Sequence, residues 1–224
     1  MISKNIRGSS RDHVYNSIRT QIMAGAIPPG EKLSEKEISE QFNVSRTPVR
    51  EAFLKLSQEE LLNIYPQIGS IVSKIDLKLV EEGRFVRKNI EKAVIKEVAE
   101  VINQEDLLQL ETNLTLQNFS LEKGSYQRLF ELDNEFHQLL YSACKKQRTW
   151  AMVQQMNIQF DRLRLLRLSV NHDWGIVVSQ HHNIYQAIVD KEPILAEQAA
   201  IEHLNLVEFE INQLLEDHPN FFMV

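Results

Sequence analysis

The sequence predicts a mainly α-helical chain in which three short helices and a β-hairpin precede an all-α helical bundle. Amphipathic segments with helical spacing occupy most of the 224 residues. One stretch, "LLNIYPQIGSIVSKI", changes to β-branched and aromatic residues around "PQIG", which is typical of a hairpin. After residue 77 glycines are few and the prolines are Pro193 and Pro219, as expected for a bundle.

The N-terminal elements each carry a local signal. Apolar residues at helical spacing predict a first helix from about Ser10 to Ala24, with Gly25 as its stop. "IPPGEKLS" predicts a turn, after which Ser34 can cap a helix through Gln41, with Glu37 at the position of a capping box. Asn43 then turns the chain. A third helix starts at Ser45, and Pro48 falls in its first turn, where the missing N–H does least harm. Its buried side is predicted to hold Val49, Ala52, Phe53 and Leu56.

The order helix, turn, helix, turn, helix, hairpin predicts a winged helix-turn-helix domain over residues 1–76 and an all-helical domain over 77–224. The charge differs between the two parts. Residues 1–76 hold ten Lys/Arg and nine Asp/Glu, 10 − 9 = +1, and the remainder holds fifteen and twenty-two, 15 − 22 = −7. A near-neutral N-terminal domain permits DNA binding but does not demonstrate it.

A single cysteine, Cys144, excludes an internal disulfide framework, and a reducing cytoplasm is the simplest compartment. The chain shows no N-terminal apolar signal segment and no apolar run of membrane-spanning length. We therefore expect a cytoplasmic protein that has no membrane partner.

Polar residues cluster where a helix-turn-helix would meet a major groove. Arg46, Thr47 and Arg50 lie at the opening of the third helix, opposite its apolar side, and arginine can bridge guanine O6 and N7. Lys36 in the preceding helix would meet the DNA backbone, and Gly69 in the hairpin would allow close approach to phosphate. The alternative is that the arginines are merely solvated on an exposed helix face.

The stretch from "PPGEKLSEKEISEQFNVSRTPVREAF" to the hairpin glycine closely resembles the winged-helix domain of the GntR family of bacterial transcription regulators. The resemblance implies DNA contacts from Lys36, Ser45, Arg46, Thr47, Arg50 and Gly69. Family members often carry a basic residue just before the wing glycine, whereas this chain has Ile68. We therefore expect a weaker electrostatic contact between the wing and DNA.

In "LDNEFHQLL", Asp133 and His137 share an apolar helix face with Phe130 and Leu140, and a buried charge there needs a partner. Two further histidines, His181 and His203, lie among apolar helical neighbours. Three imidazoles and a carboxylate on inward faces suit a divalent cation, most simply Zn²⁺, with Ni²⁺, Co²⁺, Mn²⁺ or Fe²⁺ also admissible. Each histidine taken singly is more often a hydrogen-bonded core or surface residue.

The second half also resembles the FCD domain, the all-helical ligand-binding domain of the FadR-type branch of the GntR family. "LDNEFHQLL", "SQHHNIYQAIVDKEPILAEQA" and "IEHL" resemble its metal-binding elements, which implies Asp133, His137, His181 and His203 as ligands. Gln180 stands where a glutamate is common, and "KKQR" replaces an Asn-containing turn. The resemblance further implies that a small carboxylate effector docks at the metal.

Three arginines are candidates for binding that effector, since guanidinium matches carboxylate geometry. They are Arg87, Arg164 and Arg167. The alternative is that "DRLRLLRL" keeps its leucines inward and its arginines in water.

Together these features predict a homodimeric transcription regulator, most simply a repressor, that binds near-palindromic double-stranded operator DNA and responds to a small organic acid. It is not expected to be an enzyme. One alternative is a metal-dependent hydrolase fused to a DNA-binding domain, with Glu135 or Glu202 as its acid or base. Another is a regulator whose metal is purely structural.

Overall fold

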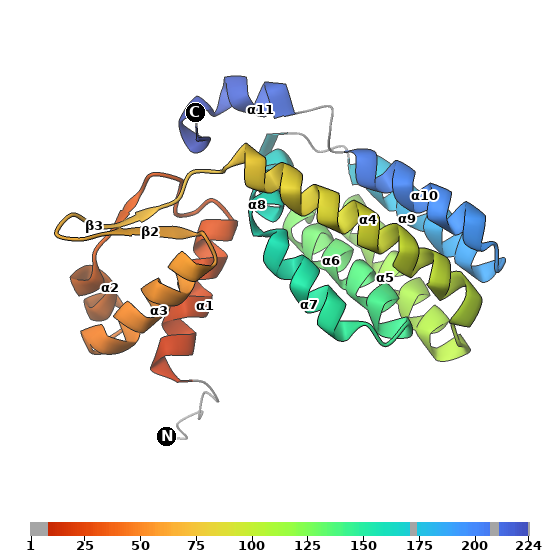
Figure 1. Cartoon of the computed structure of the whole chain (residues 1–224), viewed down its shortest axis with the longest axis horizontal. Coiled ribbons are helices and arrows are strands. Elements are labelled where there is room, and N and C mark those ends of the chain that lie inside the picture. The colour runs from red at the N-terminus through yellow and green to blue at the C-terminus, as the bar shows by residue number, and fades with distance from the viewer. Residues whose placement is uncertain (1–8, 171–173, 207–210, 224) are drawn as a thin grey trace. The chain divides into compact units, whose positions relative to one another are not determined.

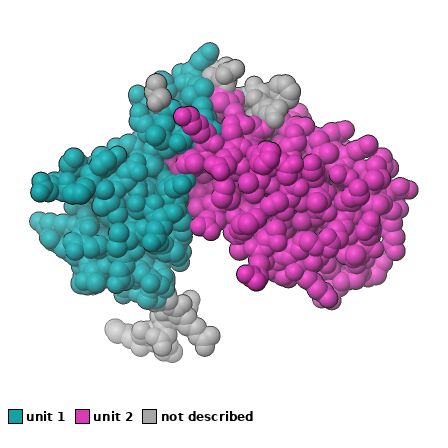
Figure 2. Space-filling model, viewed as in Figure 1, with its two compact units in different colours: residues 1–77, 215–224 teal, residues 78–214 magenta. Residues whose placement is uncertain are grey.

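The computed structural model describes residues 9–170, 174–206 and 211–223. The chain divides into two compact units, residues 1–77 with 215–224 and residues 78–214 (Figure 2). The predicted mainly α-helical fold, with a small sheet in the N-terminal part and an all-α region after it, is confirmed (Figure 1). Within the described residues, no helix combines the length and apolar character needed to cross a bilayer.

The three predicted N-terminal helices are α1 (Ser10–Met23), α2 (Glu35–Gln41) and α3 (Arg46–Gln58). Ser34 caps α2, because its hydroxyl accepts a hydrogen bond from the Glu37 backbone N–H at 3.4 Å. Asn43 has a φ of +51° and makes the tight turn between α2 and α3. The apolar side of α3 is buried as predicted, by Val49, Ala52, Phe53 and Leu56.

The wing is a three-stranded antiparallel sheet in the order β1-β3-β2. The predicted hairpin consists of β2 (Leu62–Tyr65) and β3 (Gly69–Val72), and Tyr65 pairs with Gly69 at its tip. The short strand β1 (Lys32–Leu33) was not predicted, since these residues were expected in the turn after α1. Two residues carry too little pattern to indicate a strand, and β1 exists because it pairs with β3.

The C-terminal unit contains helices α4 (Leu77–Val101), α5 (Gln104–Glu122), α6 (Tyr126–Ala143), α7 (Gln147–Met156), α8 (Ile158–Val170), α9 (Trp174–Val189) and α10 (Pro193–Asn205). Helix α5 packs along α6, and α9 packs along both α10 and α5 (Figure 1). Gly83 allows α4 to approach the end of α7 closely, because a Cβ atom at Gly83 would lie 2.5 Å from the Met156 carbonyl oxygen.

The bundle core mixes aliphatic and aromatic side chains of these helices. Phe136, Leu140 and Tyr141 of α6 are fully buried together with Ile184 and Ile188 of α9. Burial of these side chains stabilises the bundle and fixes the rotation of each helix about its axis. The same rotation turns the polar members of the inward faces of α6 and α9 toward the interior.

The C-terminal segment differs from the expected division at residue 76. Helix α11 (Ile211–Asp217) leads to a 3₁₀ turn (Pro219–Phe221), and Phe222 forms a parallel bridge with Ile75. The Ile75 N–H donates to the Phe221 carbonyl, and the Met223 N–H donates to the Ile75 carbonyl. These bonds group residues 215–224 with the N-terminal unit, whereas the sequence placed them with the bundle.

Candidate metal centre and DNA-contacting surface

Three histidines and one aspartate come together inside the bundle. Asp133 and His137 lie one turn apart on α6, His181 lies on α9, and His203 lies on α10. All four are buried, and one ligand atom from each lies within 4.8 Å of the others. The structure thus brings together the four residues that the sequence singled out, on the three helices expected.

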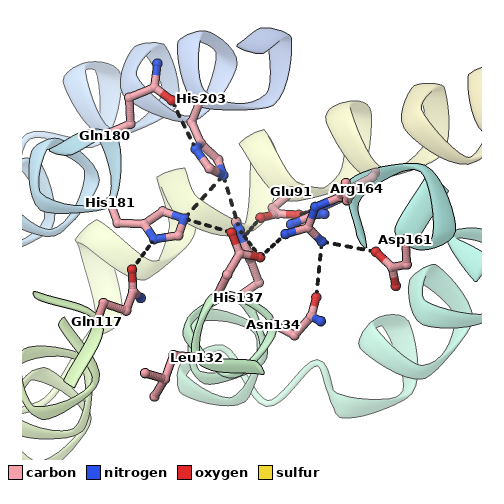
Figure 3. A network of polar contacts seen from close by, with 12 residues as sticks. Glu91, Gln117, Leu132, Asn134, His137, Asp161, Arg164, Gln180, His181 and His203 are labelled. Carbon is pink, nitrogen blue, oxygen red and sulfur yellow. Dashed lines mark hydrogen bonds and ion pairs between the residues drawn. The ribbon is translucent and has the colours of Figure 1, made fainter. Parts of the chain in front are cut away.

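The spacing of the ring nitrogens suits a metal ion. His203 Nε2 lies 3.2 Å from His137 Nε2 and 3.3 Å from His181 Nε2 (Figure 3). With zinc–nitrogen bonds of about 2.0–2.1 Å, two nitrogens of a tetrahedral site lie about 3.3–3.4 Å apart. The Asp133 carboxylate is slightly farther out, at 3.6 Å from His181 Nε2 and 3.9 Å from His137 Nε2.

The other nitrogen of each ring faces an oxygen acceptor. His181 Nδ1 lies 2.8 Å from Gln117 Oε1, His203 Nδ1 lies 3.3 Å from Gln180 Oε1, and His137 Nδ1 contacts Glu91 Oε1 (Figure 3). Acceptors at all three Nδ1 positions favour the tautomer that carries its proton there. The Nε2 atoms are then left as bare acceptors that face one another.

A hydrogen-bond chain fixes this orientation at His181. The Leu132 carbonyl can only accept, so the Asn113 side chain donates to it at 3.1 Å. Asn113 Oδ1 therefore accepts from Gln117 Nε2 at 2.7 Å, which leaves Gln117 Oε1 to accept from the ring. Because the Leu132 carbonyl can only accept, the direction of each hydrogen bond in this series is determined. The proton of His181 is thus at Nδ1.

This arrangement fits a cation. The His181 and His203 rings are neutral, and Nε2 lone pairs that converge without a proton between them are costly to bury unpaired. A divalent ion in the centre would satisfy all three lone pairs and the Asp133 charge at once. The donor set, three nitrogens and one carboxylate oxygen, is one that zinc and its first-row neighbours accept.

The electrostatics keep the ligands in their metal-binding forms. Burial lowers the pKa of His181 to about 3 and lowers the pKa of His203 well below its usual value, so both rings are neutral. Burial alone would raise the pKa of Asp133, but the charge of the Arg164 guanidinium holds it below its usual range. Likewise, His137 and Arg87 outweigh burial and lower the pKa of Glu91 to about 2.

A cavity opens beside these ligands. Its free volume is about 40 Å³, and a site needs roughly 10–15 Å³ of such volume to hold one water, so the cavity has room for about three waters. The lining combines two of the four candidate ligands, four arginines and apolar groups: Asp133, His203, Arg84, Arg87, Arg164, Arg167, Phe160, Trp174, Val177, Leu204 and Leu206.

The three arginines suggested as effector-binding residues all line this cavity. Arg164 contacts Asp133 Oδ2 and donates to Asp161 Oδ1 at 3.0 Å. Arg87 donates to Glu91 Oε2 at 2.9 Å. Arg164 and Arg167 are only 7% and 9% exposed, so the alternative that they lie in water is wrong.

The residues suggested for DNA contact are gathered on the other unit. Ser45, Arg46 and Thr47 are exposed at the start of α3, and Arg50 lies one turn further along the same helix. Lys36 is exposed on α2, where its ammonium lies 4.0 Å from the Glu40 carboxylate. Gly69 sits at the tip of the wing with a φ of +119°, a conformation that favours glycine.

Arg50 is already engaged by a neighbour. Its Nε and Nη2 donate to the two Glu35 carboxylate oxygens at 3.3 and 3.1 Å. The hydrogen bonds to Glu35 raise the pKa of Arg50. This side-on contact leaves the Nη1 end of the guanidinium available, because arginine has five donors in a fixed fork.

Sequence reasoning missed the residues that orient the imidazoles, namely Glu91 and Gln117. A signal existed for both. Arg87 and Glu91 form a charged pair one turn apart on the apolar face of α4, and Asn113 and Gln117 repeat this with amides on α5. Gln180, noted only as a departure from the usual glutamate, still provides the oxygen that faces His203.

Known proteins resemble the chain along nearly its whole length. Residues 10–72 match the model of bacterial regulatory proteins of the gntR family, and residues 84–206 match the FCD domain. The chain is 36% identical to the HTH-type transcriptional repressor RspR of Escherichia coli, over 93% of this chain and 92% of the relative. It is 31% identical to an HTH-type transcriptional regulator of Streptomyces ambofaciens, over 99% and 93%.

Solved structures share the fold. Escherichia coli McbR/YncC covers 94% of this chain and 99% of its own, with a TM-score of 0.77 at 22% identity. A transcriptional regulator GntR from Rhodococcus sp. RHA1 covers 93% and 99%, with a TM-score of 0.74 at 23% identity. With both domain models matched and relatives above 30% identity that span the chain, this protein belongs to the GntR family of DNA-binding transcription regulators and carries an FCD domain.

Proposed function

We propose that this regulator is a repressor whose operator affinity is controlled by a small carboxylate bound beside a divalent metal in the FCD domain. The observation that carries the proposal is the convergence of three Nε2 atoms with each Nδ1 facing an oxygen acceptor. Imidazoles oriented in this way, next to a cavity lined with arginines, support the proposal that the domain senses an anion.

The proposed metal ligands are Asp133, His137, His181 and His203, and zinc suits them best among the divalent ions. When bound, such an ion supplies Lewis acidity to an oxygen of the effector. Arg87, Arg164 and Arg167 are proposed to hold the carboxylate itself through charge-assisted hydrogen bonds. The Arg164 contact with Asp133 ties the anion site to the metal ligands.

The metal content of the purified protein tests the proposed metal ligands. In protein purified without chelators, we expect elemental mass spectrometry to find one equivalent of a divalent metal. His181→Ala should abolish retention, whereas His182→Ala serves as a matched control, because His182 is exposed and lies outside the cluster. Equal metal content in all three proteins would overturn the ligand assignment.

At the DNA, Arg46, Thr47 and Arg50 are proposed to contact the major groove, with Lys36, Ser45 and Gly69 at the backbone. A homodimer would place two such domains on the half-sites of a near-palindromic operator. Selection of duplexes from a random-sequence pool, followed by light scattering of the free protein, tests both statements. A monomeric mass, or no enriched sequence, would contradict them.

Effector control is tested with a selected duplex and a panel of small mono- and dicarboxylates. A cognate acid is expected to weaken DNA binding by about 5–150-fold, the range of typical allosteric coupling. Arg167→Gln should weaken this response while DNA affinity without the acid is unchanged. If no acid changes the affinity while operator binding is intact, the proposed effector control is wrong and the proposal of a repressor still stands.

A purely structural metal is the alternative to an effector-docking metal. Removal of the metal with a chelator distinguishes a structural metal from an effector-docking metal. If the ion is structural, the chelated bundle should lose its cooperative unfolding transition at the normal temperature. We expect chelated protein to stay folded and to lose its response to carboxylates.

The hydrolase alternative is disfavoured because the relatives are transcription regulators. Its two nominated groups, Glu135 and Glu202, are exposed rather than gathered at the buried ligands. Turnover by metal-loaded protein that a chelator abolishes would favour it.

A further inference from the structure

The solvent-facing side of the wing sheet is formed by alternate residues of three strands. Pairing sets Lys32 opposite Ile71 and Tyr65 opposite Gly69. Because paired residues and every second residue of a strand share a face, Lys32, Tyr65 and Gly69 lie on the same side. Leu33 and Val72, on the opposite side, are buried.

This face carries one charge. Across β1, β2 and β3, which the structure describes in full, Lys32 is the single charged residue. The hairpin sequence "LNIYPQIGSIV" itself has no basic residue, and Ile68 occupies the position just before the wing glycine. Any positive charge on the wing sheet must therefore come from the strand that the sequence did not indicate.

The Lys32 side chain runs across the surface of Gly69. A Cβ atom on Gly69 would lie 3.1 Å from Lys32 Cε and 3.9 Å from its Nζ. Glycine is favoured at this position by its φ of +119°, and the lysine stem passes close over it. The ammonium is carried from β1 to the tip of the hairpin.

The ammonium is free to meet a partner. Lys32 is exposed, and among the parts of the chain that the structure describes no hydrogen bond or ion pair engages its Nζ. Tyr65, on the other side of Gly69, is 45% exposed and adds a phenol. Lysine, tyrosine and bare backbone at one point are groups that proteins use to contact DNA phosphates.

We propose that Lys32 is a phosphate-contacting residue of the wing and supplies the charge that the hairpin lacks at Ile68. The inference rests on the DNA contacts proposed for α3, since α3 and the wing belong to the same domain. With this contact, the wing is no longer expected to hold DNA weakly, because β1 supplies the cation that the hairpin lacks.

The test is the salt dependence of DNA binding by the full chain, with a duplex that the wild-type protein recovers from a random-sequence pool. For Lys32→Gln, each lost phosphate contact should reduce the slope of log K against log salt by about 0.9. Affinity should fall by the same factor for selected and random duplexes. Lys123→Gln, which removes an exposed charge from the bundle, should leave the slope unchanged.

A rescue variant makes the test specific to the position of the charge. Ile68 is 58% exposed, so Ile68→Lys adds a cation beside Gly69 without touching the core. In the Lys32→Gln background it should restore the wild-type slope. A wild-type slope in Lys32→Gln, or no recovery in the double variant, would overturn the proposal.

Failure of the DNA contacts proposed for α3 gives a different result. If Arg46→Ala leaves both affinity and base preference intact, the assignment of α3 is wrong, whatever Lys32 does. If Arg46→Ala weakens selective binding while Lys32→Gln keeps the full slope, only the wing inference fails. Thermal unfolding of each variant confirms that the folds are comparable.

Discussion

The two candidate sites place their functional side chains in opposite environments. In the DNA-binding domain the side chains are exposed, with Arg50 at 68% of its side-chain surface, and they contact few neighbours. In the FCD domain they are buried, with His137 and His181 at 0%, and each contacts two or more others. Substitution in the first should change DNA binding alone, whereas substitution in the second should change stability and ligand binding together.

The largest effect is expected for Asp133→Ala. It breaks a buried ion pair with Arg164, and removal of one partner from such a pair typically costs about 3–5 kcal/mol. Denaturant unfolding of chelated protein measures this loss without the metal. Glu135→Ala, on the exposed side of the same helix, is the control and should change stability by less than about 0.5 kcal/mol. Equal effects of the two variants would contradict the buried pair.

Acidification should destabilise the bundle of the chelated protein. The pKa of His181 is about 3 in the folded state, against 6.5 when unfolded, so the unfolded state binds the proton first. Stability is therefore full above pH 6.5 and is lost as pH falls toward 3, by about 2 kcal/mol at pH 5 from this group alone.

His203 shifts in the same direction, and the lowered pKa of Asp133 keeps that carboxylate ionised over this range. Unfolding curves at pH 7 and pH 5 measure the change, and in His181→Gln the difference between them should shrink. A stability that stays flat from pH 7 to pH 5 would contradict neutral buried imidazoles.

Arg46→Ala should weaken selective DNA binding and leave stability unchanged, in contrast to Asp133→Ala. A bidentate contact between arginine and guanine is worth about 1–3 kcal/mol of discrimination. Competition between selected and random duplexes measures the loss, and thermal unfolding supplies the comparison. A lower unfolding temperature would show that Arg46 is a structural residue and would weaken the contrast between the two sites.

Glu35→Gln is expected to have the smallest effect. The exposed contact between Glu35 and Arg50 adds little to stability, but it holds the guanidinium in one orientation on α3. Loss of the carboxylate removes a charge that repels phosphate, so binding to random duplexes should strengthen while preference for the selected sequence falls. The ratio of the two affinities is the measurement, and Glu40→Gln, which faces Lys36, is the control.

The elements with a strong local signal were predictable. Ser34 as a cap, Pro48 in a first turn and the apolar side of α3 are decided by residues within a few positions of each other. The four candidate metal ligands were also identifiable, because charged and imidazole groups on apolar helix faces demand an explanation. Strand β1 and the bridge between Ile75 and Phe222 were not, since they depend on partners far along the chain.

By itself, the sequence determined the helices, the wing hairpin, the family and the candidate residues for metal and DNA binding, because these follow from short-range patterns and ordered motifs. Only the tertiary structure decided that Gln117 and Glu91 orient the imidazoles, that Arg164 joins Asp133, and that Lys32 reaches Gly69. Each of these contacts joins different elements. Their geometry depends on how helices and strands pack, which no local spacing encodes.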